Sequence, residues 1–280
     1  MSKAIPIILD TDIGDDVDDA YALVLAAKWE AVDLVAVTCA FGPTLSRARL
    51  ASKLLGILGR GEVPVYAADD REGENGQLNW AAGHTYEAPS ETAPEALVRL
   101  ARERPGELTL VPIGPLSNVG RALELDPELG RRFKRIVLMG GLVDPSARPD
   151  FPQAEWNIRC DPAAARRVFQ SGAELVMVGL DVTLQVRLEE PWMKRLEAAD
   201  KPCTRALMEL TALWGHGVPT LHDPLALSCV ERQFCRMKPL RVEIADDGRT
   251  LVELGEANVM AAVEVDAEGF LDWYTATIVR

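Results

Sequence analysis

The chain alternates short apolar runs with longer stretches in which apolar residues recur at helical spacing. Short runs rich in β-branched residues are typical of buried parallel strands, whereas apolar positions three and four residues apart indicate helices. We expect strands at residues 5–9, 33–38, 63–66, 108–113, 134–139 and 175–178, and the main helices at 20–29, 44–57, 92–104, 189–199 and 203–214. Strand and helix alternate for 180 residues without a linker or repeat. This order predicts one α/β domain over residues 1–280, a doubly wound, mostly parallel sheet flanked by helices.

Residues typical of helix starts and turns refine this prediction. Thr92 and Glu95 have the spacing of a capping box at a helix start. Asp161-Pro162 and His222-Asp223-Pro224 each suggest an N-cap followed by a first-turn proline. Near the C-terminus, residues 240–244 and 250–254 flank an Asp-Asp-Gly turn, which predicts a small β-hairpin.

Six aspartates follow the first predicted strand, at positions 10, 12, 15, 16, 18 and 19. Crowded carboxylates raise one another's pKa, so a fold that keeps them ionised must supply a cation. They lie where a strand leads into a helix, and in an open α/β sheet that edge is where ligands bind. We therefore weigh a hard-cation site against an acidic solvated loop that caps the helix.

An EF-hand is excluded, because the loop places Gly14 at its fifth position and Tyr21 where a chelating glutamate is needed. No two of the three histidines have the spacing of a metal pair. Oxygen ligands select Ca2+ or Mg2+ rather than zinc.

Composition limits the partners. A formal charge of -13 and a pI near 4.8 argue against nucleic acid or an anionic membrane surface, and favour a neutral or cationic small substrate. No N-terminal apolar segment of the signal-peptide kind and no membrane-length apolar run is present. Five cysteines without a C-x-x-C pair fit reduced thiols. We expect a cytoplasmic protein.

The stretch Asp10-Thr-Asp12-Ile-Gly14, followed by Asp18-Asp19-Ala, resembles the D-x-D-P-G-x-D-D-A signature of the inosine-uridine-preferring nucleoside hydrolases. Ile13 replaces the usual proline, and two extra residues precede the Asp-Asp-Ala. A His-Asp-Pro at 222–224 and a Glu-Trp-Asn at 155–157 resemble two further family segments. The resemblance implies a Ca2+-dependent nucleoside N-ribohydrolase, a small-molecule substrate, and a homodimer or homotetramer.

The resemblance also implies roles for single residues. Asp12, Asp19, Asp223 and the carbonyl of Ile113 would hold the Ca2+, with Asp10 and Asp16 as alternatives. A water held by the metal would be deprotonated by Asp12, and His222 would protonate the leaving base. Asp18, Glu155 and Asn157 would bind the ribose. If residues 155–157 are extended, the last two side chains point the same way.

Two positions depart from the family. Pro43 and Pro149 stand where asparagines are expected. Because those asparagines are absent, the first alternative is a metal-bound ribose or nucleoside binding protein without turnover. A D-x-D phosphatase is the second alternative, but it would need threonine or valine where Gly14 stands.

Overall fold

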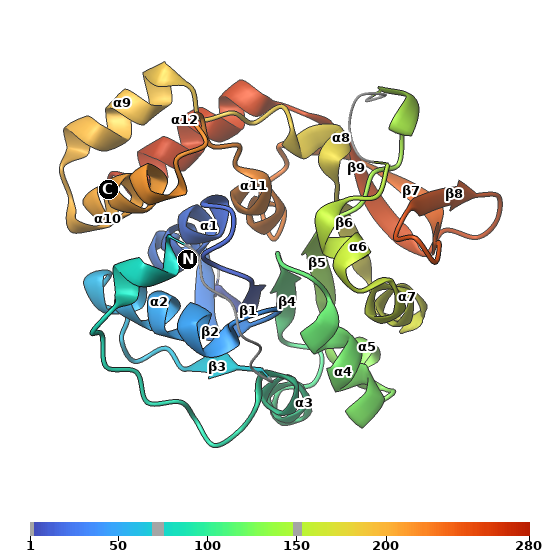
Figure 1. Ribbon diagram of the computed structural model, residues 1–280. Helices are drawn as coiled ribbons and strands as arrows, with labels where there is room; N and C mark the ends of the chain where they lie inside the picture. The colour runs from blue at the N-terminus through green and yellow to red at the C-terminus, as the bar shows by residue number, and fades with distance from the viewer. Residues whose placement is uncertain (1–2, 69–75, 148–152) are drawn as a thin grey trace.

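The computed structural model describes residues 3–68, 76–147 and 153–280. Within these ranges the chain forms a nine-stranded sheet in the order β3-β2-β1-β4-β5-β6-β9-β7-β8, with helices on both faces (Figure 1). All neighbouring strands are parallel except the two pairs that β7 makes, with β8 and β9. The predicted doubly wound fold is therefore confirmed. Pro149 lies outside the described residues.

The strands are β1 Ile5–Thr11, β2 Val32–Cys39, β3 Val65–Ala67, β4 Thr109–Pro112, β5 Arg135–Met139, β6 Leu175–Val178, β7 Cys235–Ile244, β8 Thr250–Glu253 and β9 Val259–Val265. The α-helices are α1 Asp18–Lys28, α2 Thr44–Ile57, α3 Ala93–Glu103, α4 Ser117–Leu125, α5 Leu129–Arg132, α6 Trp156–Cys160, α7 Pro162–Gln170, α8 Leu180–Thr183, α9 Glu190–Ala199, α10 Pro202–Trp214, α11 His222–Ser228 and α12 Ala267–Ile278. Two short 3-10 helices, Leu78–Ala81 and Pro145–Ala147, complete the set.

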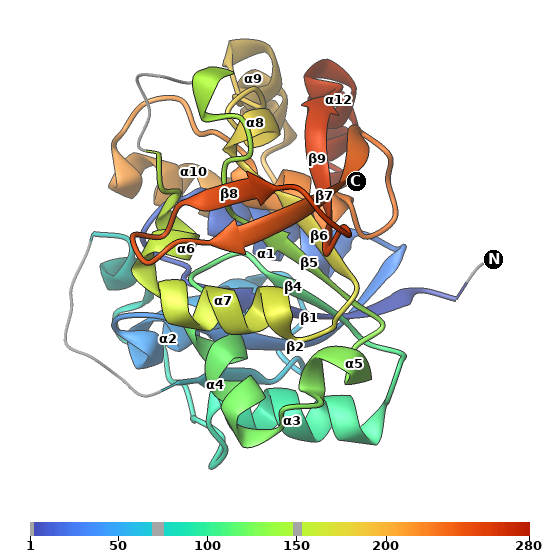
Figure 2. The same ribbon diagram turned by 90° about the vertical axis from the view of Figure 1, so that its right-hand side faces the viewer.

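Two apolar layers cover the sheet. One contains α1, α2, α10, α11 and α12, and the other contains α3, α4 and α7 (Figures 1 and 2). The central strand β1 serves both layers, since Ile7 and Leu9 pack on one face and Ile8 packs on the other. A strand buried on both faces must be apolar at every position, which explains the continuous apolar run at the start of the chain. None of the described helices has the length and apolar composition needed to cross a membrane.

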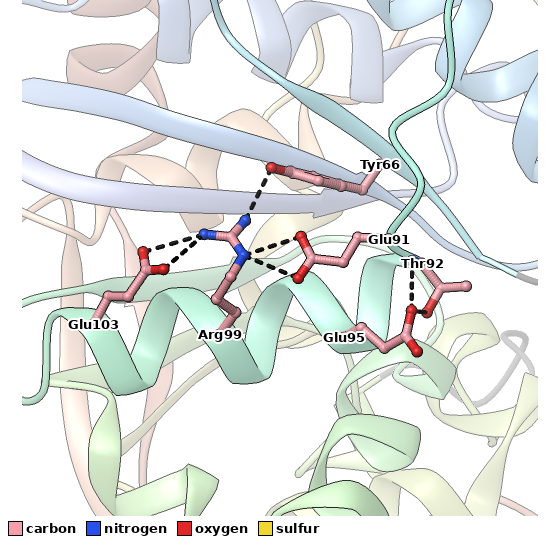
Figure 3. Close-up of polar contacts among 6 residues, drawn as sticks. All are labelled: Tyr66, Glu91, Thr92, Glu95, Arg99 and Glu103. Carbon is pink, nitrogen blue, oxygen red and sulfur yellow. Dashed lines mark hydrogen bonds and ion pairs between the residues drawn. The ribbon is translucent and has the colours of Figure 1, made fainter.

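Helix starts follow the capping signals in part. Thr92 and Glu95 form the predicted capping box at the start of α3 (Figure 3). Asp161 caps α7 by accepting the Ala164 N–H at 2.9 Å. At α11 the prediction was wrong, because the helix begins at His222 with Leu221 at its N-cap.

The sequence pattern also missed short elements. Helix α6 was not among the predicted elements, and helices α5 and α8 have only four residues each. The hairpin exists, but β7 extends it toward the N-terminus, and residues 235–240 pair with β9. The hairpin is thus part of the main sheet.

Candidate active site

The carboxyl ends of β1 and β4 and the first turns of α1 and α11 meet around a cavity of about 650 Å³. Nine of the ten residues singled out in the sequence line it: Asp12, Asp16, Asp18, Asp19, Ile113, Glu155, Asn157, His222 and Asp223. Residues more than 200 positions apart are thus brought together by the parallel sheet. The tenth, Asp10, is not among the lining residues.

Three buried carboxylates form the centre of the cavity. Oxygen atoms of Asp18, Asp19 and Asp223 all lie within 4.8 Å of one another. The Asp223 N–H donates to Asp18 Oδ2 at 3.0 Å, which ties the start of α11 to the start of α1. Burial, followed by repulsion from neighbouring aspartates, raises the pKa of each of the three carboxyls well above its usual value. Such a group is stable in its ionised form only beside a cation.

Asp12 and Ile113 stand beside this group. Burial raises the pKa of the Asp12 carboxyl to about 7, and the charge of Arg47 acts in the opposite direction. A Cβ on Gly114 would lie 2.5 Å from Asp12 Oδ1, so only glycine allows the carboxylate to sit against this turn. Ile113, one residue earlier, lines the same cavity. With Asp19 and Asp223 these groups make an all-oxygen donor set, which fits a hard divalent cation.

The other aspartates of the stretch have different surroundings. Asp10 Oδ1 accepts hydrogen bonds from Thr38 Oγ1 at 2.6 Å and from Asn118 Nδ2 at 2.7 Å, inside the protein core. Burial raises its pKa to about 7. Asp16 lines the cavity and accepts the N–H of its own neighbour Val17 at 2.7 Å. Neither belongs to the compact carboxylate group.

Glu155 and Asn157 are held by a short helix, so the extended backbone that would point both side chains the same way is not present. Glu155 is the N-cap of α6, and its carboxylate accepts the N–H groups of Asn157, Ile158 and Gly141 at 2.8, 3.1 and 3.0 Å. Asn157 Nδ2 donates to the Ile113 carbonyl at 2.7 Å. Free backbone N–H groups at a helix start favour a nearby carboxylate, and here they hold Glu155 at the start of α6. Both side chains still line the cavity.

His222 opens α11 and lines the same cavity. Its Nδ1 lies 2.7 Å from Thr183 Oγ1, which leaves Nε2 for a ligand. Burial lowers the pKa of the imidazole to about 4, so the ring is neutral at neutral pH.

The sequence analysis missed Arg47, which lies beside the site, and several lining residues, of which Trp156 is one. Arg47 is buried and contacts the aspartate-rich turn, although arginine at the fourth position of a helix usually marks a solvated face. Trp156 lines the cavity, is 49% exposed, and packs its ring against Arg159 and the edge of Phe41. Its place between Glu155 and Asn157 was the one available signal.

Four other aromatic residues do not line this cavity: Trp80, Tyr86, Trp214 and His216. Trp80 donates to Glu209 at 2.7 Å, and Tyr86 donates to the Val65 carbonyl at 2.9 Å. Trp214 and His216 pack edge to face, with ring centroids 5.2 Å apart. The apolar part of the lining comes instead from Met139, Leu180, Leu184 and Trp156.

Comparison with known proteins places this geometry in a family context. The model of the inosine-uridine preferring nucleoside hydrolase family matches residues 7–272. The pyrimidine-specific ribonucleoside hydrolase RihA of Enterobacter sp. (strain 638) is 34% identical over 311 residues, covering 96% of each chain. RihA of Citrobacter koseri is 32% identical with the same coverage.

Solved structures agree. The plant nucleoside hydrolase PpNRh1 superposes with a TM-score of 0.86 at 25% identity, covering 99% of both chains. The purine-preferring ribonucleoside hydrolase from Gardnerella vaginalis superposes with a TM-score of 0.85 at 26% identity, covering 98% of both chains.

Proposed function

The chain belongs to the inosine-uridine-preferring nucleoside hydrolase family, and on that premise we propose that it hydrolyses the N-glycosidic bond of ribonucleosides with Ca2+ as its cofactor. The products are ribose and the free base. The observation that carries the proposal is the buried group of Asp18, Asp19 and Asp223 in a cavity of nucleoside size. A structural role does not account for carboxylates that burial and repulsion make so costly to ionise.

Four groups would hold the cation: the carboxylates of Asp12, Asp19 and Asp223 and the carbonyl of Ile113. All four are oxygen donors on the cavity wall, the donor type that Ca2+ takes in proteins. When bound, the cation lowers the pKa of water and orients it near the anomeric carbon. Asp18, Glu155 and Asn157 remain for the ribose hydroxyls.

Asp12 takes the proton of the attacking water. Before the cation binds, burial raises the pKa of Asp12, and the same burial makes the ionised carboxylate a stronger proton acceptor than an exposed one. Direct attack passes through a cationic sugar, which the surrounding carboxylates stabilise, and it inverts the anomeric centre.

The leaving base lies on the apolar side of the cavity, against Leu180, Leu184 and Trp156. His222 lines the same cavity, and as a neutral imidazole it assists the departing base by donating a hydrogen bond. Because the relatives at 32–34% identity are named as pyrimidine-specific, we propose pyrimidine ribonucleosides as the preferred substrates.

The proposal is tested by measuring reducing-sugar release from uridine, cytidine, inosine and adenosine, with wild-type protein and with Asp12→Asn. We expect release from the wild type, fastest with a pyrimidine nucleoside. In Asp12→Asn we expect kcat to fall about 100- to 10,000-fold, because the general base is lost. If no nucleoside releases ribose but calcium still binds, the protein is a binding protein or acts on another glycoside. Near-normal turnover in Asp12→Asn would remove Asp12 as the base.

A further inference from the structure

Arg47 is the one lysine or arginine that is buried among the residues the structure describes. It lies in the first turn of α2, and its side chain is 2% exposed. Burying an arginine is costly unless each part of the guanidinium is hydrogen-bonded and its charge is paired. The partners of Arg47 therefore indicate what it is for.

These partners come from two loops at the edge of the cavity. Nη1 donates to the carbonyls of Asp12 and Ile13, the second contact at 3.0 Å. Nε donates to the Phe41 carbonyl at 2.7 Å. Nη2 forms an ion pair with Asp15 at 2.8 Å. One planar side chain thus joins the turn after β1 to the turn after β2.

The second loop is shaped around the same side chain. Phe41 has φ of 57° and Gly42 has φ of 72°, the left-handed region that L side chains rarely adopt. A Cβ on Gly42 would lie 3.3 Å from Arg47 Nη2. Pro43, which follows, has no side-chain donor that could hold the aspartate turn. The guanidinium fills that role from one helical turn further along.

We propose that Arg47 is a positioning residue that fixes Asp12 in the geometry needed to bind the divalent cation and to face the substrate. The inference rests on the proposed function, since it assumes that Asp12 is a ligand and the base. Arg47 touches neither the carboxylate of Asp12 nor the cavity, so it acts through the main chain. The same contacts assign Asp15, which lies between Gly14 and the Asp-Asp-Ala, to Arg47 rather than to the cation.

The simpler alternative is that Arg47 only stabilises the fold. Arg99 on α3 provides a matched control, because its guanidinium also has several partners: Glu91, Glu103 and the Tyr66 hydroxyl (Figure 3). Arg99 lies outside the residues that line the candidate active site. Loss of either arginine should destabilise the protein, but only loss of Arg47 should change the site.

The experiment compares Arg47→Lys and Arg47→Gln with Arg99→Lys and Arg99→Gln. Calcium binding to the metal-free proteins is measured by calorimetry, kcat and KM by ribose release, and stability by urea unfolding. Lysine keeps the charge but cannot reach four acceptors at once. We expect calcium affinity and kcat to fall about 10- to 100-fold in both Arg47 variants. KM should change less than about threefold, because Glu155 and Asn157 are held by α6.

Normal calcium affinity and normal kcat in Arg47→Lys, with a loss of stability like that of Arg99→Lys, would overturn the proposal. If Arg47→Gln does not fold, Arg47→Lys decides alone, and if neither folds while both Arg99 variants do, the specific role is rejected in favour of a structural one. Calcium binding and ribose release by the wild type distinguish this outcome from failure of the proposed function. If the wild type neither binds calcium nor releases ribose, the proposed function itself is wrong.

Discussion

At the scale of single residues, the site is governed by what burial does to charge. The same desolvation raises the pKa of Asp12 to about 7 and lowers that of His222 to about 4. Both shifts favour the neutral form. Without a cation, Asp12 is therefore partly protonated at neutral pH, whereas His222 is a neutral imidazole, which can assist a departing base only as a hydrogen-bond donor.

This state of His222 leads to a prediction that depends on the leaving group. His222→Ala should lower kcat on natural nucleosides by about 100-fold or more, because their bases leave poorly without a donor. It should change kcat on p-nitrophenyl riboside much less, since that leaving group needs no proton. Steady-state rates on uridine and on the p-nitrophenyl substrate decide the point. Equal losses on both would show that His222 positions the substrate rather than assisting departure.

At the scale of elements, the long periodic segments could be predicted from sequence because apolar spacing alone determines them. The continuous apolar run of β1 and the aspartates after it were enough to locate the site. Helix α6 was missed because five residues carry too little periodicity, and its start depends on Glu155 receiving an N–H from the distant Gly141. Arg47 was missed for a similar reason, since its partners in the aspartate-rich turn lie more than 30 residues earlier in the chain. Contacts between distant segments leave no local signal.

The two consecutive helix caps, Glu155 on α6 and Asp161 on α7, allow a matched test. In Glu155→Gln an amide NH2 replaces an oxygen that accepts buried N–H groups, so we expect a loss of about 1–2 kcal/mol in unfolding free energy. We also expect KM to rise about 10-fold or more, because a ribose contact is lost. Asp161→Asn should cost only a few tenths of a kcal/mol, since asparagine is a good N-cap, and should leave KM unchanged. Urea unfolding and steady-state kinetics measure both. An unchanged KM in Glu155→Gln would limit Glu155 to capping.

At the scale of the whole molecule, the sheet collects negative charge that the protein neutralises only in part. Asp12, Asp18, Asp19 and Asp223 all have a raised pKa. Without a cation they therefore stay protonated up to a higher pH than an ordinary carboxyl group does. A cation must displace those protons to bind. Calcium should therefore bind more weakly at pH 6 than at pH 8, and binding should release protons.

The central claim is that Asp12, Asp19, Asp223 and the Ile113 carbonyl hold the calcium on which nucleoside hydrolysis depends. The most direct test is ribose release from uridine by chelator-treated protein as Ca2+ is added back, at pH 6 and at pH 8. We predict no release before addition, full recovery on saturation of one site, and half-recovery at a Ca2+ concentration about 10-fold or more lower at pH 8 than at pH 6. Asp19→Asn, measured in parallel, should need far more Ca2+. A full rate in excess chelator, unchanged by added Ca2+ at either pH, would contradict the account.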